Sequence, residues 1–226
     1  MEERYRRNIE AISEEENAAL FEKKVCIIGC GGLGGYIIEI LARIGVGSLI
    51  VVDGDVFEES NLNRQLYSKM ELLGKSKAES AYERILEINP EIKVKYIYDF
   101  FDESNYAKII NNSDVVVDAL DNIKTKKFLQ KVCEELDIPL VHGAIGGWYG
   151  QVATVLPGDK TLDIIYKGKE DKGVEKILGN LPFTASCTAS YQSSEVIKLL
   201  IKRGDLLRKK ILFIDMLNNE SEIINL

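Results

Sequence analysis

Charged and amide side chains gather in the stretch that follows an apolar run ending at residue 52. Asp53 and Asp55 come directly after this run, and Arg64 and Lys77 follow in the next loop and helix. The same stretch carries amides at Asn61, Asn63 and Gln65. Cations can bind a polyanion, carboxylates can accept hydrogen bonds from sugar hydroxyls, and amides can donate hydrogen bonds. These residue types predict a site for a phosphate-bearing ligand, and the two cations favour a triphosphate.

A glycine turn precedes this group. Apolar residues 25–28 lead into GCGGLG, helical spacing follows through 37–44, and a second apolar run, 49–52, ends on Asp53. This strand, turn, helix and strand place backbone amides against phosphate and an acid against ribose. The predicted nucleotide-binding glycines are Gly29, Gly31, Gly32 and Gly34. Because such turns also occur in domains without nucleotide, a purely structural turn is the alternative.

A third candidate group follows a short buried strand at 115–117. The sequence there reads DALDN, and acids at the carboxyl end of a parallel strand face the ligand crevice. Asp121 is therefore a candidate Mg²⁺ ligand, since Mg²⁺ on nucleotide phosphates takes one or two carboxylates. The structural alternative makes Asp121 the N-cap of a helix over 122–136. For Lys77, in the first turn of a helix expected over 72–88, the alternative is a solvated surface lysine.

Composition limits the function classes. The 226 residues are 46% hydrophobic and carry 29 basic against 36 acidic side chains, a net charge of −7. This balance argues against a general nucleic-acid surface. No signal segment opens the chain and no apolar run approaches the length of a bilayer span, so we expect a cytoplasmic protein without membrane contact. The cysteines form no C-x-x-C pair, which predicts neither disulfides nor a tetrathiolate zinc site: Cys26, Cys30, Cys133 and Cys187.

The order of elements predicts one α/β domain over 1–226. We expect a helical arm over 1–22, in which Ser13 and Glu16 form a capping box, and a Rossmann-like nucleotide-binding part over 23–145. The rest, 146–226, should add antiparallel strands, a crossover loop over 158–183 and a helix over 184–201. The fold class is thus a doubly wound, mostly parallel sheet continued by antiparallel strands, in three α/β/α layers. His142 is the sole histidine, and we interpret it as structural.

With these motifs in view, the chain resembles the MoeB/ThiF/HesA family, bacterial relatives of ubiquitin-activating enzymes. The resemblance covers nearly the whole chain through RYRRNI from Arg4, GCGGLGG from Gly29, VVDGD around Asp53, SNLNRQ from Ser60, GKSKAES from Gly74, DALDN from Asp118 and QSSEVIKLL from Gln192. It implies adenylation by ATP of the C-terminal carboxylate of a ubiquitin-fold sulfur carrier that ends in Gly-Gly. Pyrophosphate is released.

The resemblance also implies roles for individual residues. Arg64 and Lys77 would supply positive charge to the phosphates, Asp121 would hold Mg²⁺, and Asp53 would hold the ribose. Further nucleotide contacts are expected from Asp55, Asn61, Gln65 and Asn122. In homodimers of the family an arginine of the partner's N-terminal motif reaches the triphosphate. It corresponds here to Arg7, although Asn8 replaces the usual glutamine.

Two departures from the family pattern bear on the cofactors. Many members bind zinc through paired C-x-x-C motifs, which this chain lacks, so no zinc is expected. Sulfur-transferring members use a cysteine in the crossover region, and Cys187 is the nearest candidate, although its position does not match. We interpret Cys187 as a packing residue with a covalent role as the alternative. A cysteine desulfurase is a further implied partner, and thiamine and molybdopterin synthesis are among the implied pathways.

Three other functions remain in competition. A tRNA threonylcarbamoyladenosine dehydratase of the same superfamily would adenylate a carboxylate on tRNA, which the acidic balance disfavours. An NAD-binding oxidoreductase would account for Gly29 and Asp53 but would leave Arg64, Lys77 and Asp121 without a role. A non-catalytic partner, like the inactive halves of eukaryotic heterodimers, is disfavoured by the near-complete set of ATP residues.

Overall fold

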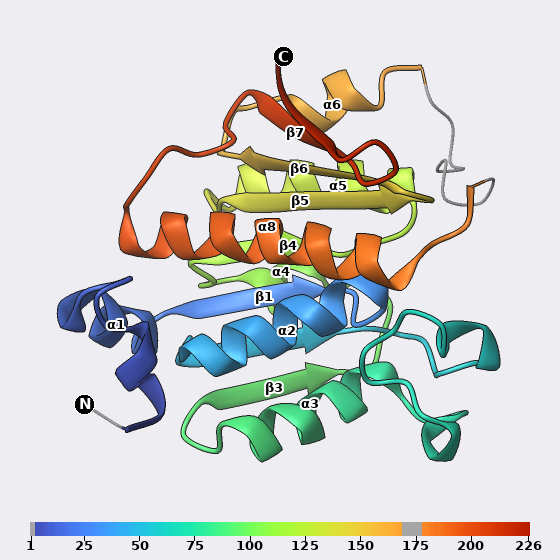
Figure 1. Cartoon of the computed structure of the whole chain (residues 1–226). Helices are drawn as coiled ribbons and strands as arrows, with labels where there is room; N and C mark the ends of the chain where they lie inside the picture. The colour runs from blue at the N-terminus through green and yellow to red at the C-terminus, as the bar shows by residue number, and fades with distance from the viewer. Residues whose placement is uncertain (1–2, 169–177) are drawn as a thin grey trace.

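A single eight-stranded sheet forms the centre of the molecule (Figure 1). The computed structural model describes residues 3–168 and 178–226. The strands lie in the order β3-β2-β1-β4-β5-β6-β7-β8. Their bounds are β1 (Lys24–Ile28), β2 (Ser48–Val52), β3 (Lys93–Ile97), β4 (Val115–Asp118), β5 (Leu140–Gly146), β6 (Tyr149–Val155), β7 (Lys210–Asp215) and β8 (Glu220–Asn225). Pairing from β3 to β5 is parallel and from β5 to β8 antiparallel, which confirms the predicted fold class.

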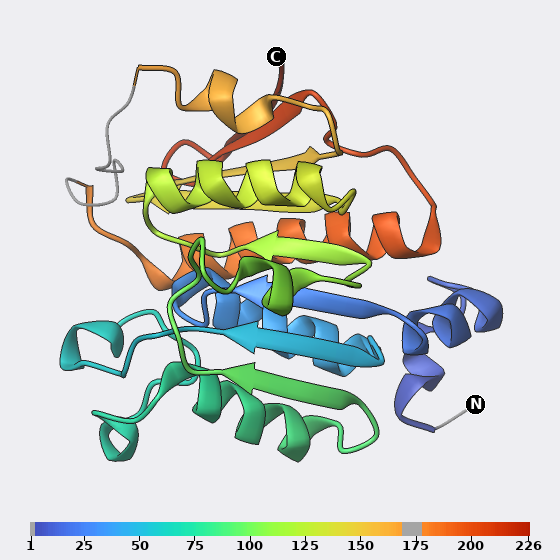
Figure 2. The same ribbon diagram turned by 180° about the vertical axis from the view of Figure 1, so that it is seen from behind.

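Helices cover both faces of the sheet. Figure 1 shows α2 (Gly32–Ile44), α3 (Lys77–Ile88) and α8 (Pro182–Ile201) on one face, and Figure 2 shows α4 (Tyr106–Ile110) and α5 (Ile123–Glu135) on the other. Alternate side chains of β1 lie on opposite faces of the sheet: Val25 and Ile27 pack under α2, whereas Cys26 and Ile28 pack under α5. The central strands are therefore apolar throughout, as in other parallel sheets buried on both sides.

The N-terminal arm packs against the amino ends of the parallel strands (Figure 1). It consists of a 3₁₀ helix, η1 (Glu3–Asn8), and α1 (Glu14–Phe21). The capping box of Ser13 and Glu16 is present, as predicted. Tyr5 and Leu20 are buried, so the arm is anchored to the core rather than fully solvated.

Several element boundaries differ from the sequence prediction. The helix expected over 72–88 begins at Lys77, because Gly74 adopts a φ of +79° and the hydroxyl of Ser76 accepts a hydrogen bond from the backbone of Glu79. Two short 3₁₀ turns precede it, η2 (Glu59–Asn61) and η3 (Met70–Leu72). The last helix starts at Pro182 rather than residue 184, since proline suits the first helical turn.

In the predicted crossover loop, 158–183, the short helix α6 (Thr161–Ile165) lies in the part before residue 169. Leu162 and Tyr166 pack into the core under α5. Residues 169–177 of this loop lie outside the described part of the chain. Within 3–168 and 178–226, the helices are all too short or too polar to cross a bilayer.

Candidate nucleotide site

The glycine turn is closed by two of its four glycines. A β-carbon on Gly34 would lie 1.9 Å from the carbonyl oxygen of Gly29. Gly29 itself has a φ of +104°, and a β-carbon there would lie 2.5 Å from the carbonyl oxygen of Ala119. Since neither position accepts a side chain, Gly29 and Gly34 shape the turn between β1 and α2.

The other two glycines border side chains of the SNLNRQ motif. A β-carbon on Gly32 would lie 3.6 Å from Nε of Arg64, and one on Gly31 would lie 3.4 Å from Nε2 of Gln65. Gly31 is the N-cap of α2 and provides no side-chain cap. The fold thus places a guanidinium and an amide beside the positive end of α2.

Asp53 ties the glycine turn to the segment that follows β2. One carboxylate oxygen accepts a hydrogen bond of 2.7 Å from the backbone N–H of Cys30, and the other accepts one of 2.8 Å from Asp55. Burial raises the pKa of the Asp53 carboxyl, while both backbone donors act in the opposite direction. The acid lies next to the turn, as a ribose-binding residue would.

Lys77 is buried beside these acids. Its ammonium lies 3.1 Å from a carboxylate oxygen of Asp55, and the residue is only 7% exposed. The alternative of a solvated surface lysine is therefore wrong. The charge of Lys77 acts to lower the pKa values of both Asp53 and the Cys30 thiol, against the effect of burial.

Two amides predicted to contact a nucleotide already have roles within the fold. Asn61 is buried, and its side-chain oxygen accepts a hydrogen bond of 3.0 Å from the backbone N–H of Glu58. Asn122 is the N-cap of α5 and accepts a hydrogen bond of 2.8 Å from the backbone N–H of Thr125. Gln65 differs, because its buried side-chain oxygen has no partner within the described chain.

Asn122, and not Asp121, is the N-cap of α5. Because Asn122 caps α5, the alternative that assigned this cap to Asp121 is wrong. Asp121 is exposed and lines the same cavity as Arg64. Burial lowers the pKa of the Arg64 guanidinium, and the charge of Asp121 opposes this. An exposed carboxylate without a capping role fits a Mg²⁺ ligand.

The cavity between Arg64 and Asp121 extends along the ends of β5 and β6. Its volume is about 360 Å³. Beyond Gly32, its wall is mainly apolar and aromatic, with Leu33, Ile145, Tyr149, Ile165, Tyr166 and Phe213. Polar groups of Lys126, Gln151 and Asn180 face it as well. The cavity thus has a charged end at the glycine turn and an apolar part.

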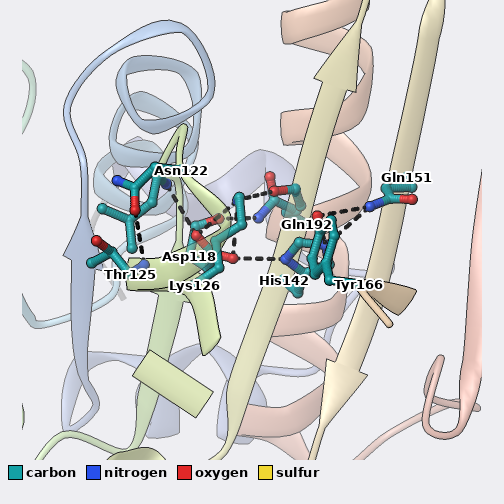
Figure 3. A network of polar contacts seen from close by, with 10 residues as sticks. Asp118, Asn122, Thr125, Lys126, His142, Gln151, Tyr166 and Gln192 are labelled. Atoms are coloured by element: carbon teal, nitrogen blue, oxygen red, sulfur yellow. Dashed lines mark hydrogen bonds and ion pairs between the residues drawn. The ribbon is translucent and has the colours of Figure 1, made fainter. Parts of the chain in front are cut away.

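A buried polar network lies behind this wall (Figure 3). The ammonium of Lys126 lies 3.0 and 3.1 Å from the two oxygens of Asp118, and Nδ1 of His142 lies 2.7 Å from one of them. Nε2 of His142 lies 3.2 Å from the hydroxyl of Tyr166 and 3.3 Å from the amide of Gln151. The network therefore holds three residues of the cavity wall, Lys126, Gln151 and Tyr166.

The pKa values in this network follow from its charges. Burial alone would raise the pKa of Asp118, but Lys126 and His142 outweigh it and the pKa is lowered. Burial is the main cause that lowers the pKa of His142. The prediction that His142 is structural agrees with its complete burial. The sequence did not identify Lys126, Gln151 or Tyr166, although Lys126 lies one turn into α5 and so beside the end of β4.

Two other candidates lie away from the cavity. Arg7 is exposed in η1, at the amino ends of the strands, whereas the glycine turn lies at their carboxyl ends (Figure 1). Cys187 packs against the small apolar cluster of Val152, Leu207, Leu212 and Ile214. Burial raises the pKa of its thiol, which opposes thiolate formation.

Comparison with known proteins decides the family. The model of the ThiF family matches residues 5–226. The chain belongs to the ThiF family. A SAMP-activating enzyme E1 of Haloferax volcanii is 37% identical over 230 residues, which cover 98% of this chain and 84% of that relative.

Of two further matches of this ThiF-family chain, one covers less of the chain and the other has a lower sequence identity. A tRNA threonylcarbamoyladenosine dehydratase of Haemophilus influenzae is 41% identical over 135 residues, 59% of this chain; the match spans about half of that relative, 51%. A crystal structure of E. coli MccB with ATP has a TM-score of 0.86 at 23% identity and covers 100% of this chain and 72% of that one. The latter likeness shows that the two chains share the same fold.

Proposed function

We propose that this ThiF-family chain uses ATP to adenylate the C-terminal carboxylate of a small ubiquitin-fold sulfur carrier. The observation that carries the proposal is the position of Arg64, beside Gly32 at the start of α2 and on the same cavity as Asp121. Membership of the family supports it. So does the similarity to the SAMP-activating enzyme E1, which extends over almost the entire chain.

The geometry suggests how the nucleotide is held. Phosphates would lie against the uncapped N-terminus of α2, where backbone amides and the helix dipole favour anions. Asp53, fixed by Cys30 and Asp55, would accept hydrogen bonds from the ribose hydroxyls. Lys77 would approach the phosphates from the far side of the turn.

The reaction balances without a proton transfer. A carboxylate oxygen of the carrier attacks the α-phosphorus of ATP, the bond from that phosphorus to the bridging oxygen breaks, and pyrophosphate leaves with the electron pair. The product is an acyl-adenylate. Because two anions approach each other, fixed cations at the phosphate oxygens lower the barrier, and Arg64 and Lys77 would supply them. Mg²⁺, held by Asp121, would neutralise further phosphate charge.

The apolar part of the cavity fits the carrier's tail. A tail ending in two glycines is thin, and the cavity of about 360 Å³ runs from Arg64 towards Tyr149, Tyr166 and Phe213. A carboxylate at the tip would therefore arrive next to the phosphates. The buried network behind Tyr166 and Gln151 would hold this wall in place.

Several partners complete the proposal. The chain would act as a homodimer in which Arg7 of one subunit reaches the triphosphate of the other, since Arg7 lies at the wrong end of its own sheet. A cysteine desulfurase would supply the sulfur to the activated carrier. Zinc has no role in this scheme.

An exchange assay tests the proposal. Radioactive pyrophosphate should enter ATP only when a candidate carrier of β-grasp fold ending in Gly-Gly is present, because exchange requires reversible adenylation of its carboxylate. A carrier that lacks the last two glycines is the matched control. Absence of exchange with every carrier encoded beside the chain's gene would contradict the proposal.

The second candidate is a tRNA threonylcarbamoyladenosine dehydratase. The 41% identity over 59% of the chain favours it, whereas the limited coverage and the net charge of −7 favour the carrier, because tRNA binding requires a basic surface. The same assay separates the two: exchange that depends on tRNA rather than on a carrier would establish the dehydratase.

A further inference from the structure

We propose that the side chain of Phe100 is the surface on which the adenine base of ATP stacks, and that Gly54 is required to hold its ring there. This inference rests on the proposed function. It adds a positioning residue for the base to the residues that bind the ribose and the phosphates.

Phe100 is an exposed aromatic residue at the same end of the sheet as the glycine turn. The residue is 63% exposed, among the highest values for large apolar residues of the described chain. It follows β3, the neighbour of β2, and the two strands are in register with Val52 opposite Ile97. The backbone N–H of Asp53 bonds to the carbonyl of Ile97 at 3.1 Å. Phe100 therefore lies on the segment adjacent to the ribose-binding acid.

One end of the ring is packed directly on Gly54. A β-carbon at Gly54 would lie 2.7 to 2.8 Å from three ring atoms of Phe100, Cγ, Cδ1 and Cδ2. The backbone of Gly54 does not adopt a positive φ, so its conformation does not require glycine. Glycine is required there because the ring of Phe100 occupies the space that a β-carbon would take. The ring is thus supported by the backbone next to Asp53 while most of its surface remains open to solvent.

The backbone of Phe100 is fixed in spite of this exposure. Its N–H donates a hydrogen bond of 2.9 Å to the carboxylate of Asp99, and its carbonyl accepts one of 2.7 Å from the side chain of Asn105. The next residue, Phe101, is buried and its ring centroid lies 5.7 Å from that of Phe128 on α5. Phe101 thereby anchors the loop, and Phe100 is presented outward.

Adenine is the ligand chemistry that suits this arrangement. A flat aromatic base gains affinity by stacking on an aromatic face, and the exposed ring lies beside the residue proposed to hold the ribose. The phosphates would be bound on the opposite side of Asp53, at the glycine turn. The three parts of the nucleotide would then have separate supports: Phe100 for the base, Asp53 for the sugar and Arg64 for the phosphates.

Calorimetric titration with two probes tests this role. We expect Phe100→Ala to weaken the binding of Mg-ATP by roughly 5- to 150-fold, the range measured when a stacking residue is truncated. Binding of inorganic tripolyphosphate, which has no base, should be unchanged. Phe100→Tyr should bind Mg-ATP as the wild type does, and Phe100→Leu should resemble Phe100→Ala, since leucine is apolar but has no aromatic face. Phe21→Ala, at a phenylalanine that is 42% exposed near the other end of the sheet, is the control and should change neither affinity.

The packing on Gly54 gives a second test. Gly54→Ala should displace the ring and weaken Mg-ATP binding, and adding Phe100→Ala to it should weaken binding little further, because both changes remove the same support. Additive losses, or wild-type affinity for Mg-ATP in Phe100→Leu, would overturn the role of Phe100. Failure of the wild-type chain itself to bind Mg-ATP would instead contradict the proposed function.

Discussion

Lys126 and Asp118 form an ion pair that is almost completely removed from solvent, with side chains 5% and 0% exposed and an N–O distance of 3.0 Å. Lys126 also donates a hydrogen bond of 3.0 Å to the carbonyl of Gly143. The pair joins α5 to the ends of β4 and β5, directly behind the wall of the cavity.

Removing the cation of this pair should destabilise the fold. Lys126→Met leaves the carboxylate of Asp118 buried with fewer partners, and loss of one member of a buried pair costs about 3–5 kcal/mol. Lys131→Met on the same helix is the control, because Lys131 is 71% exposed and its pair with Glu135 should contribute little. Urea denaturation measures both, and equal stabilities of the two variants would refute the role of the pair.

The burial of His142 leads to a prediction of how the stability of the fold depends on pH. Burial lowers the pKa of His142 in the folded chain, so below its ordinary value of about 6.5 the unfolded chain binds the proton more tightly. Stability should therefore be fully present above pH 6.5 and fall as the pH drops, with a slope of up to about 1.4 kcal/mol per pH unit. His142→Gln should flatten this slope between pH 6.5 and 5. An unchanged slope in the variant would show that His142 does not titrate as inferred.

Arg64 should affect catalysis without affecting folding. Arg64→Ala removes a cation at the start of α2, and we expect carrier-dependent exchange to fall by roughly 10²- to 10³-fold, as for the loss of one electrostatic donor. Arg43→Ala, on the outer end of the same helix where Arg43 pairs with Glu39, should retain full exchange. Similar rates in the two variants would remove Arg64 from the mechanism.

Substitution of Asp121 should affect activity, whereas substitution of its neighbour Asn122 should affect stability. Asp121→Asn should abolish exchange at low Mg²⁺ while the midpoint of denaturation stays within error, because Asp121 does not cap α5. Asn122→Ala should cost about 1 kcal/mol through loss of the cap. The reverse pattern, with stability lost in the first variant and activity kept, would restore the capping role to Asp121.

Sharing of sites between subunits can be tested by mixing. Arg7→Ala and Arg64→Ala chains should each be nearly inactive alone, but a mixed dimer contains one site with both arginines intact. Exchange should then return to about a quarter of the wild-type value if dimers form at random, and to about a half if only mixed dimers form. Mass spectrometry should verify the mixed dimer, and if it forms without restoring exchange, Arg7 does not act across the interface.

Sequence patterns predicted the sheet and the glycine turn because both are encoded locally. Apolar runs of strand length and a glycine cluster before a helical pattern are visible without knowledge of distant contacts. The alternative that made Asp121 the cap of α5 was wrong by one residue, since aspartate and asparagine are both good caps and only the backbone position decides between them.

Contacts between distant segments could not be predicted in the same way. Nothing in the spacing shows that Lys77 is buried against Asp55, or that Phe100 occupies the space left by Gly54. The same applies to Asp118, Lys126 and His142, which come from three elements and meet only when β4 lies between its neighbours. These contacts depend on strand order, which single-residue patterns do not specify.

The pairing of Lys77 with Asp55 means that the chain neutralises this cation before any ligand arrives. An incoming anion competes with a carboxylate for this ammonium, and the Asp55 side chain, which is 55% exposed, has room to turn into water. A weakly charged anion gains little from such an exchange, whereas a polyphosphate gains much. Asp55 would thus act as an internal competitor that keeps small cellular anions out of the site.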